Sequence, residues 1–240
     1  MFDQFFTISV SPEVISSLIV VTIIAILAVI VGIQARFQNP LKKPKGLLLL
    51  AEIGVKFFDN FTEGLIGRRL PGFGGVVFCC AIYLFISFIF GLTGLPSPVT
   101  CMAVPFSLGL TAFLCIHTVS IKFTKWKYFK RYVEPFPVFL PINLISMWSP
   151  VLSLTFRLFG NAVAGMTLMS LLYTFVGSLG PAVITVTGES LHVGGFIAPF
   201  VTPLLHAYFD LFSGLIQTTV FISLMTIFTG QEIPDEDLES

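Results

Sequence analysis

The stretch VISSLIVVTIIAILAVIVGI, residues 14–33, decides the class of fold. Its only polar members are Ser16, Ser17 and Thr22, and a helix of about 20 apolar residues is what crosses about 30 Å of hydrocarbon. Of all 240 residues, 55% are hydrophobic and 11% are charged. Such a composition cannot surround one soluble core without exposing large apolar faces. The chain is therefore expected to be an all-α, polytopic membrane protein embedded in a lipid bilayer.

The basic residues are segregated although the net charge is zero. Of 13 lysines and arginines, all except Arg157 fall within residues 36–69 and 122–131. Basic residues close to span ends favour the cytoplasmic side. The leader, residues 1–13, carries Asp3 and Glu13 and no positive charge, so we expect no cleaved signal peptide. With five crossings, the N-terminus is expected outside and the C-terminus, with a solvated acidic tail over residues 230–240, in the cytoplasm.

Residues 47–67 form an amphipathic pattern in which apolar side chains alternate with Glu52, Lys56, Asp59 and Glu63. The pattern predicts a helix that lies on the inner membrane surface. Packing of its apolar side on a soluble neighbour is the alternative.

The other apolar segments predict the remaining crossings. Residues 74–93 and 100–121 each have the length of one span, and no charged residue occurs between Arg69 and Lys122. Residues 136–176 are too long for one upright helix, so this segment is expected to tilt strongly, to kink at proline, or both. A link rich in Gly, Pro, Ser and Thr leads to a last long, tilted helix over residues 196–229. These two long helices are expected to pair as a hairpin.

Arg157 lies alone in the apolar segment 136–176. Placing an arginine in hydrocarbon costs from about 2.5 to over 10 kcal/mol, which favours a functional role over a packing role. A polar stripe precedes it at helical spacing and holds Asn143, Ser146, Ser149 and Ser153. This stripe predicts either a wet path on the arginine's face or serines that serve close helix packing and bond their own backbone.

The last helix carries His206, Asp210 and Gln217 at spacings that place them on one face. An aspartate in mid-membrane is expected either to carry ions or to form a structural ion pair with Arg157. His206, one turn before Asp210, is either a proton relay or an interfacial, hydrogen-bonded histidine.

Two motifs carry a resemblance to a known family. Residues 153–161 read SLTFRLFGN and are followed by Ala164 and Gly165, while residues 210–221 read DLFSGLIQTTVF. Together they resemble subunit a of the F-type ATP synthase, and the likeness in layout covers residues 14–229. The resemblance implies that ions cross through two offset half-channels and are carried between them by carboxylates of a rotating c-ring of small proteolipids. Peripheral-stalk b subunits and a soluble catalytic head would complete the complex. The lack of a basic targeting segment favours a bacterial inner membrane over that of an organelle.

The same resemblance assigns roles to individual residues. Arg157 would meet each ring carboxylate, because a guanidinium keeps its proton and favours the ionised acid. Gln217 and Asn161 would hold Arg157 in register, and Asp210 and His206 would belong to the outer half-channel. The stripe from Asn143 to Ser153 would line the inner half-channel.

One position departs from the family pattern. Many members have an ionisable residue nine positions after the arginine, where this chain has Met166. The acid function would then fall on Asp210, with His206, Glu189 or His192 compensating.

The sequence favours no other chemistry. The four cysteines have no metal-ligand spacing, and the chain has no HExxH, GxSxG or phosphate-cradling glycine loop. We therefore expect no catalytic centre, metal, cofactor or nucleic-acid partner. A secondary ion-coupled transporter and an intramembrane enzyme remain as alternatives, although we find neither the internal repeat of the first nor the nucleophile of the second. The sequence does not distinguish protons from sodium ions.

Overall fold

A computed structural model describes residues 11–38, 44–67, 70–125, 138, 140–178, 183–186 and 189–233. Within these residues, five helical segments are long and apolar enough to cross a membrane: Pro12–Phe37, Phe73–Thr93, Ala103–Thr124, Leu140–Val176 and Phe200–Gln231. The prediction of an all-α, polytopic membrane protein is confirmed.

The structure describes seven α-helices. Their bounds are α1 (Pro12–Phe37), α2 (Leu47–Ile66), α3 (Phe73–Ile89), α4 (Ala103–Thr124), α6 (Leu140–Ser178), α7 (Val193–His206) and α8 (Ser213–Gln231). Two 3₁₀ turns, η2 (Phe90–Thr93) and η3 (Pro98–Thr100), join α3 to α4. A π-helical segment, η5 (Ala207–Phe212), joins α7 to α8.

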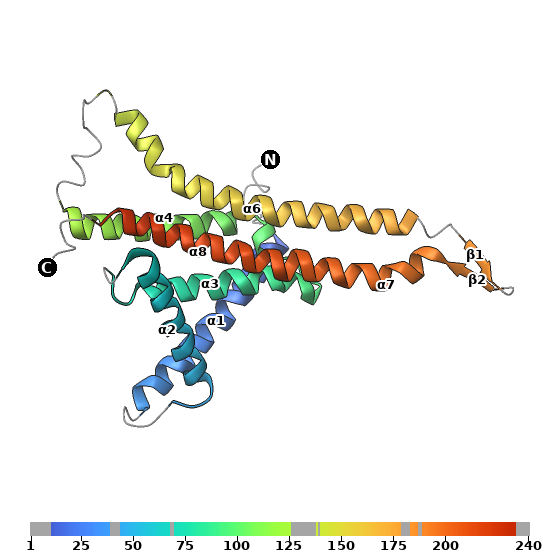
Figure 1. Ribbon diagram of the computed structural model, residues 1–240, viewed down its shortest axis with the longest axis horizontal. Helices are drawn as coiled ribbons and strands as arrows, with labels where there is room; N and C mark the ends of the chain where they lie inside the picture. Colours follow the sequence, from blue (N-terminus) through green and yellow to red (C-terminus); the bar gives the residue numbers. More distant parts are fainter. Residues whose placement is uncertain are drawn as a thin grey trace, which may run out of the picture.

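Helix α2 lies across the direction of α3 and α8 (Figure 1). Part of its apolar side packs on the chain itself, because the rings of Phe58 and Phe78 lie 5.5 Å apart and Ile66 is buried. Leu50 and Phe57 stay more than 60% exposed. An amphipathic helix with an uncovered apolar edge, lying across membrane-spanning neighbours, suits the membrane surface.

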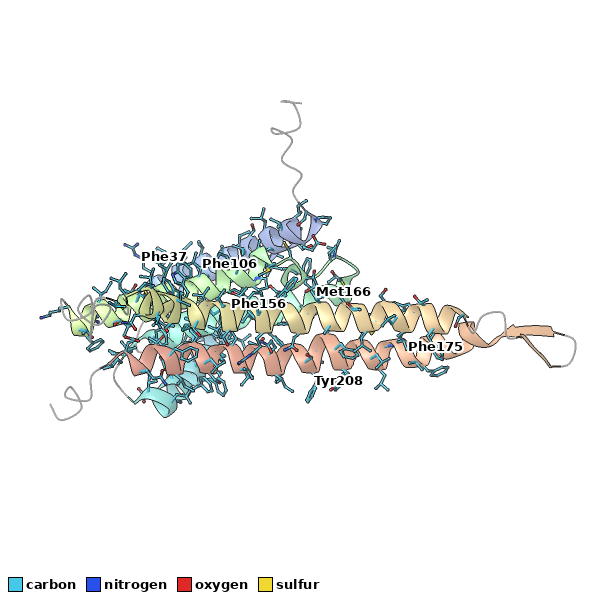
Figure 2. All side chains as sticks on the ribbon, turned by 90° about the horizontal axis from the view of Figure 1, so that it is seen from above. Phe37, Phe106, Phe156, Met166, Phe175 and Tyr208 are labelled. Carbon is cyan, nitrogen blue, oxygen red and sulfur yellow. The ribbon has the colours of Figure 1, made fainter. Side chains whose placement is uncertain are left out.

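The two long helical segments run side by side as a hairpin, and both views show α6 beside α7–η5–α8 (Figures 1 and 2). Helix α6 has 39 residues, which corresponds to about 58 Å and exceeds the hydrocarbon thickness of about 30 Å. Its N-terminal part leaves the line of the rest in Figure 1. Pro150 lies inside α6 and accounts for this bend, because proline removes one backbone hydrogen bond.

A buried apolar core joins α3, α4, α6 and α8. Its largest fully buried side chains include Leu84, Leu154, Leu158, Phe221 and Met225. A glycine lets two of these helices approach closely, because a Cβ added at Gly109 would lie 2.5 Å from Oγ1 of Thr155 in α6. The core therefore fixes one side of α6 and leaves the other side uncovered.

Two expectations need correction. The link between the long helices contains an antiparallel hairpin of β1 (Val183–Val186) and β2 (Glu189–His192), where the sequence indicated only a link rich in Gly, Pro, Ser and Thr. The expectation of a solvated tail is wrong for residues 232–233, which follow α8. Helix α8 continues to Gln231, Ile233 is only 5% exposed, and Ser120 Oγ donates to Glu232 Oε2 at 2.7 Å. The hydrogen bond holds Glu232 against α4.

Some expectations fall outside the described residues. They concern the acidic tail over residues 234–240, the leader with Asp3, and the start of the long segment at residues 136–137. Seven of the clustered basic residues also lie there: Lys42, Lys43, Arg68, Arg69, Lys127, Lys130 and Arg131.

The contact between α2 and α3 gives a stability prediction. A Cβ added at Gly74 would lie 2.6 Å from the backbone nitrogen of Asp59 and 2.7 Å from its Cα, so one of the two backbones must shift. We expect Gly74→Ala to destabilise the protein by about 1–3 kcal/mol, as overpacking does. Thermal unfolding of the purified protein in detergent measures this loss.

The adjacent glycine supplies the matched control. A Cβ at Gly75 meets nothing within 4 Å, and alanine is better than glycine inside a helix by about 0.5–1 kcal/mol. Gly75→Ala should therefore unfold at or above the wild-type temperature. Equal unfolding temperatures for the two variants would contradict this close contact.

Candidate functional site

Arg157 lies on the uncovered side of α6. Leu154 and Leu158 are at most 1% exposed and face the core, whereas Arg157, Gly160 and Ala164 are exposed. No residue in the described part of the chain forms a hydrogen bond or ion pair with Arg157. A Cβ at Gly160 would meet nothing within 4 Å. The guanidinium therefore lies beside small residues, on a surface that another molecule can approach closely.

One turn after Arg157, two amide side chains join the long helices. Asn161 Nδ2 donates to Gln217 Oε1 at 2.6 Å. Gln217 is only 3% exposed, and its Nε2 finds no hydrogen-bond acceptor among the described residues. A buried amide hydrogen bond fixes register, because sliding the helices would leave further polar atoms unpaired. Gln217 is thus level with Asn161, not with Arg157.

Asp210 takes part in a chain of hydrogen bonds. Its Oδ2 lies 2.6 Å from Nδ1 of His206, and Nε2 of His206 lies 2.5 Å from the hydroxyl of Tyr173 on α6. A neutral histidine protonated on Nδ1 donates to Asp210 and accepts from Tyr173, so every polar atom of the ring has a partner. Asp210 therefore pairs with His206, and the alternative of an ion pair with Arg157 is not seen.

The π-helical segment η5 surrounds Asp210. It covers Ala207–Phe212, and such segments inside α-helices are frequent at functional sites. A π turn holds more residues than an α turn, so it rotates α8 relative to α7. His206 and Asp210 line the same cavity as Asn161, the hydrogen-bond partner of Gln217, so the common face that the sequence predicted for His206, Asp210 and Gln217 stays a prediction.

A first cavity, of about 480 Å³, lies beside the hydrogen-bonded residues Tyr173, His206 and Asp210. It opens between α1, the η2–η3 connection, α6 and the α7–η5 segment. Its polar and ionisable lining residues are Glu13, Ser97, Thr100, Asn161, Ser170, Tyr173, Thr174, His206 and Asp210, and Met166 also lines it. We call it the outer cavity.

A second cavity, of about 410 Å³, lies at the other end of the hairpin. All four residues of the predicted inner path line it: Asn143, Ser146, Ser149 and Ser153. His117 from α4 and Glu232 from the end of α8 complete its ionisable lining. We call it the inner cavity, because it adjoins the end of α4 that carries Lys122 and Lys125.

Sequence reasoning missed several residues of these cavities. Glu13 counted only as a charge of the leader, and Glu232 only as part of the tail. Tyr173 and His117 carried a usable signal, since each is an ionisable group inside an apolar segment. The two weaker outer-path candidates, Glu189 and His192, both lie in β2, where they pair with Val186 and Val183 of β1. The structure does not describe the positions of their side chains.

Comparison with known proteins identifies the family. A sequence profile of the ATP synthase A chain family matches residues 14–230. ATP synthase subunit a of Mycoplasmoides gallisepticum is 30% identical over 236 residues, which cover 93% of this chain and 78% of that protein. That of Staphylococcus carnosus is 28% identical over 236 residues, 92% of this chain and 91% of that protein.

A third relative is named for its ion. ATP synthase subunit a, sodium ion specific, of Propionigenium modestum is 36% identical over 111 residues, which cover 46% of this chain and 31% of that protein. Because the family profile extends over nearly all of the five-span fold, the chain belongs to the ATP synthase A chain family and is a multi-pass membrane subunit of the ATP synthase complex.

Proposed function

We propose that this subunit conducts ions through two offset half-channels to and from the carboxylates of a rotating c-ring, and so couples ion flow to ATP synthesis. The single observation that carries the proposal is the position of the two cavities along α6. The inner cavity reaches Ser153 and the outer cavity begins at Asn161. Arg157 stands between them and lines neither.

The gap between the cavities gives Arg157 its role. From Ser153 to Asn161 is eight residues, or about 12 Å along a helix. An ion cannot pass this gap directly, because the fixed positive charge repels it. A carboxylate carried by a neighbouring subunit can pass, because the guanidinium stabilises its ionised form. Each carboxylate would release its ion before it passes Arg157 and take up another from the second cavity.

The remaining partners and the orientation follow from the same arrangement. The exposed face with Arg157, Gly160 and Ala164 offers a close approach for a c-ring helix. The peripheral-stalk b subunits and the soluble catalytic head would bind elsewhere. The basic residues Lys122 and Lys125 adjoin the inner cavity, so this end would face the cytoplasm of a bacterial inner membrane, with the N-terminus outside.

The transported ion is proposed to be the proton. The chain of Tyr173, His206 and Asp210 is hydrogen-bonded throughout, which suits proton transfer. The sodium-specific name of one relative makes sodium-dependent synthesis the competing outcome. In the membranes used for the tests below, a synthesis rate that rises with sodium concentration at constant pH would favour sodium.

The first prediction concerns Arg157. Arg157→Ala should abolish ion-driven ATP synthesis in inverted membrane vesicles. The complex should still assemble, because the substitution removes an exposed charge and does not disturb a packed side chain. Arg157→Lys should fail as well, since an ammonium lacks the planar fork and can lose its proton in a low-dielectric site.

Arg36→Ala is the matched control, because Arg36 is exposed at the end of α1 and takes no part in either cavity. It should keep the wild-type rate. Normal synthesis in the Arg157 variants would remove the central role of this residue.

The second prediction concerns access to the inner cavity. Cysteines placed at Ser146, Ser149 and Ser153, in a protein without its native cysteines, should react with hydrophilic thiol reagents added from the cytoplasmic side. Leu152→Cys and Leu154→Cys are the controls and should react slowly, because Leu154 is buried and Leu152 lies in an apolar stretch outside the cavity. Equal reactivity at all five positions would favour packing serines.

The third prediction concerns Asp210. Asp210→Asn should keep the complex assembled but slow proton pumping per complex by about 100-fold or more, the usual scale for losing a proton-transfer group. Asp210→Glu retains the carboxylate and should keep part of the activity. Measuring assembled complex and pumping in the same membranes separates the roles, since low assembly with full pumping per complex would indicate a structural residue.

A further inference from the structure

The described lining of the outer cavity contains acidic side chains but no lysine or arginine. Two carboxylates, Glu13 and Asp210, line it together with His206 and Tyr173, and no lysine or arginine belongs to its described lining. Asp210 is already bonded to His206. Glu13 is therefore the only carboxylate of this cavity that the hydrogen-bonded chain does not use.

The packing of α1 holds Glu13 at this place. Ser17 Oγ and the hydroxyl of Tyr83 lie 2.7 Å apart, and Ser16 and Val20 are only 3% and 1% exposed. Most other side chains of α1 are exposed, and Figure 1 shows the helix leaving the other spans toward its C-terminal end. The part of α1 that is firmly packed is thus the part that carries Glu13.

We propose that Glu13 is the proton-exchanging carboxylate of the outer half-channel, placed between the outer aqueous side and the chain of Tyr173, His206 and Asp210. The proposal rests on the proposed function and extends it to a helix on which the sequence predicted no site. During synthesis, Glu13 takes a proton from water on the outer side and gives it to water within the cavity. It returns to the carboxylate form each time, so nothing is consumed.

Three other groups in the cavity titrate or carry charge beside Glu13: Tyr173 from α6, His206 from α7 and Asp210 from η5. The η2–η3 connection contributes only Ser97 and Thr100 as polar side chains. A negative cavity of this kind concentrates protons and stabilises a proton in transit.

A structural role for Glu13 is the alternative. An acidic residue in the first turn of a helix interacts favourably with the helix dipole, by about 0.3–1 kcal/mol, and Glu13 lies in the first turn of α1. Loss of this interaction would lower stability slightly. Loss of this interaction would leave the dependence of the transport rate on outer pH unchanged. A carboxylate placed on another helix would not restore the lost stability.

The experiment uses proteoliposomes that contain the complete ATP synthase, with the outer side of the membrane facing the lumen. ATP synthesis is measured against lumenal pH at constant membrane potential, per assembled complex. Glu13→Gln should lower the rate by about tenfold or more, with a pH profile different from that of the wild type, and Glu13→Asp should restore much of the rate.

Met166 provides the sharpest control, because it lines the same cavity from α6. Met166→Glu in the Glu13→Gln background moves the carboxylate to another wall of the cavity and should raise the synthesis rate again. A structural defect at α1 would not be repaired in this way.

The outcomes separate this inference from the proposed function. If Glu13→Gln keeps the wild-type rate and pH profile while Arg157→Ala is inactive, the role of Glu13 is wrong and the two half-channels stand. A slow Glu13→Gln variant that Met166→Glu does not rescue also overturns it. If Arg157→Ala synthesises ATP normally, the proposed function itself fails.

Discussion

The arrangement depends on one guanidinium that no described residue of the chain neutralises. Arg157 is exposed on a membrane-spanning helix and has no hydrogen bond or ion pair within the described residues. Such a charge is costly in hydrocarbon, and in the proposed function a carboxylate of the c-ring lowers this cost. An internal partner would also defeat the role, because a carboxylate bound permanently to Arg157 would leave no positive charge for a passing one. The exposure of Arg157 and the smallness of Gly160 are therefore two parts of the same requirement.

The two cavities lie towards opposite ends of the long hairpin, with the Asn161–Gln217 contact between them. Near the middle, Asn161 bonds Gln217, and Leu158 is fully buried. Toward the inner end, α6 carries serines and bends at Pro150, so space remains beside α8. Toward the outer end, Gly165 and the π-helical segment around Asp210 leave the outer cavity. A continuous apolar seam along the hairpin would have removed both paths.

The sequence predicted the elements whose signals are local. Apolar runs of membrane length predicted the all-α, polytopic fold, and the isolated charges Arg157 and Asp210 were recognisable because charge is rare in such runs. The hydrogen bond between Asp210 and His206 could also be predicted from the sequence, because a spacing of four residues places two side chains on neighbouring turns of one helix. The π-helical segment could not, because nothing in residues 207–212 departs from ordinary helical spacing. The outer cavity was also out of reach, since its walls come from four segments separated by up to nearly 200 positions.

Met166 shows why reading one helix at a time is insufficient. Along α6, Met166 occupies a position where an ionisable residue was expected. The sequence analysis therefore assigned the acid function to Asp210, with compensating residues in the last helix or in the link before α7. In the folded chain Met166 and Glu13 line the same cavity, although they lie on helices far apart in the sequence. A half-channel needs a titratable group at a certain place in a wet space, and protons move through water to any group there. Because the requirement concerns the cavity and not a helix position, a carboxylate can be supplied from any wall without changing the chemistry of the path.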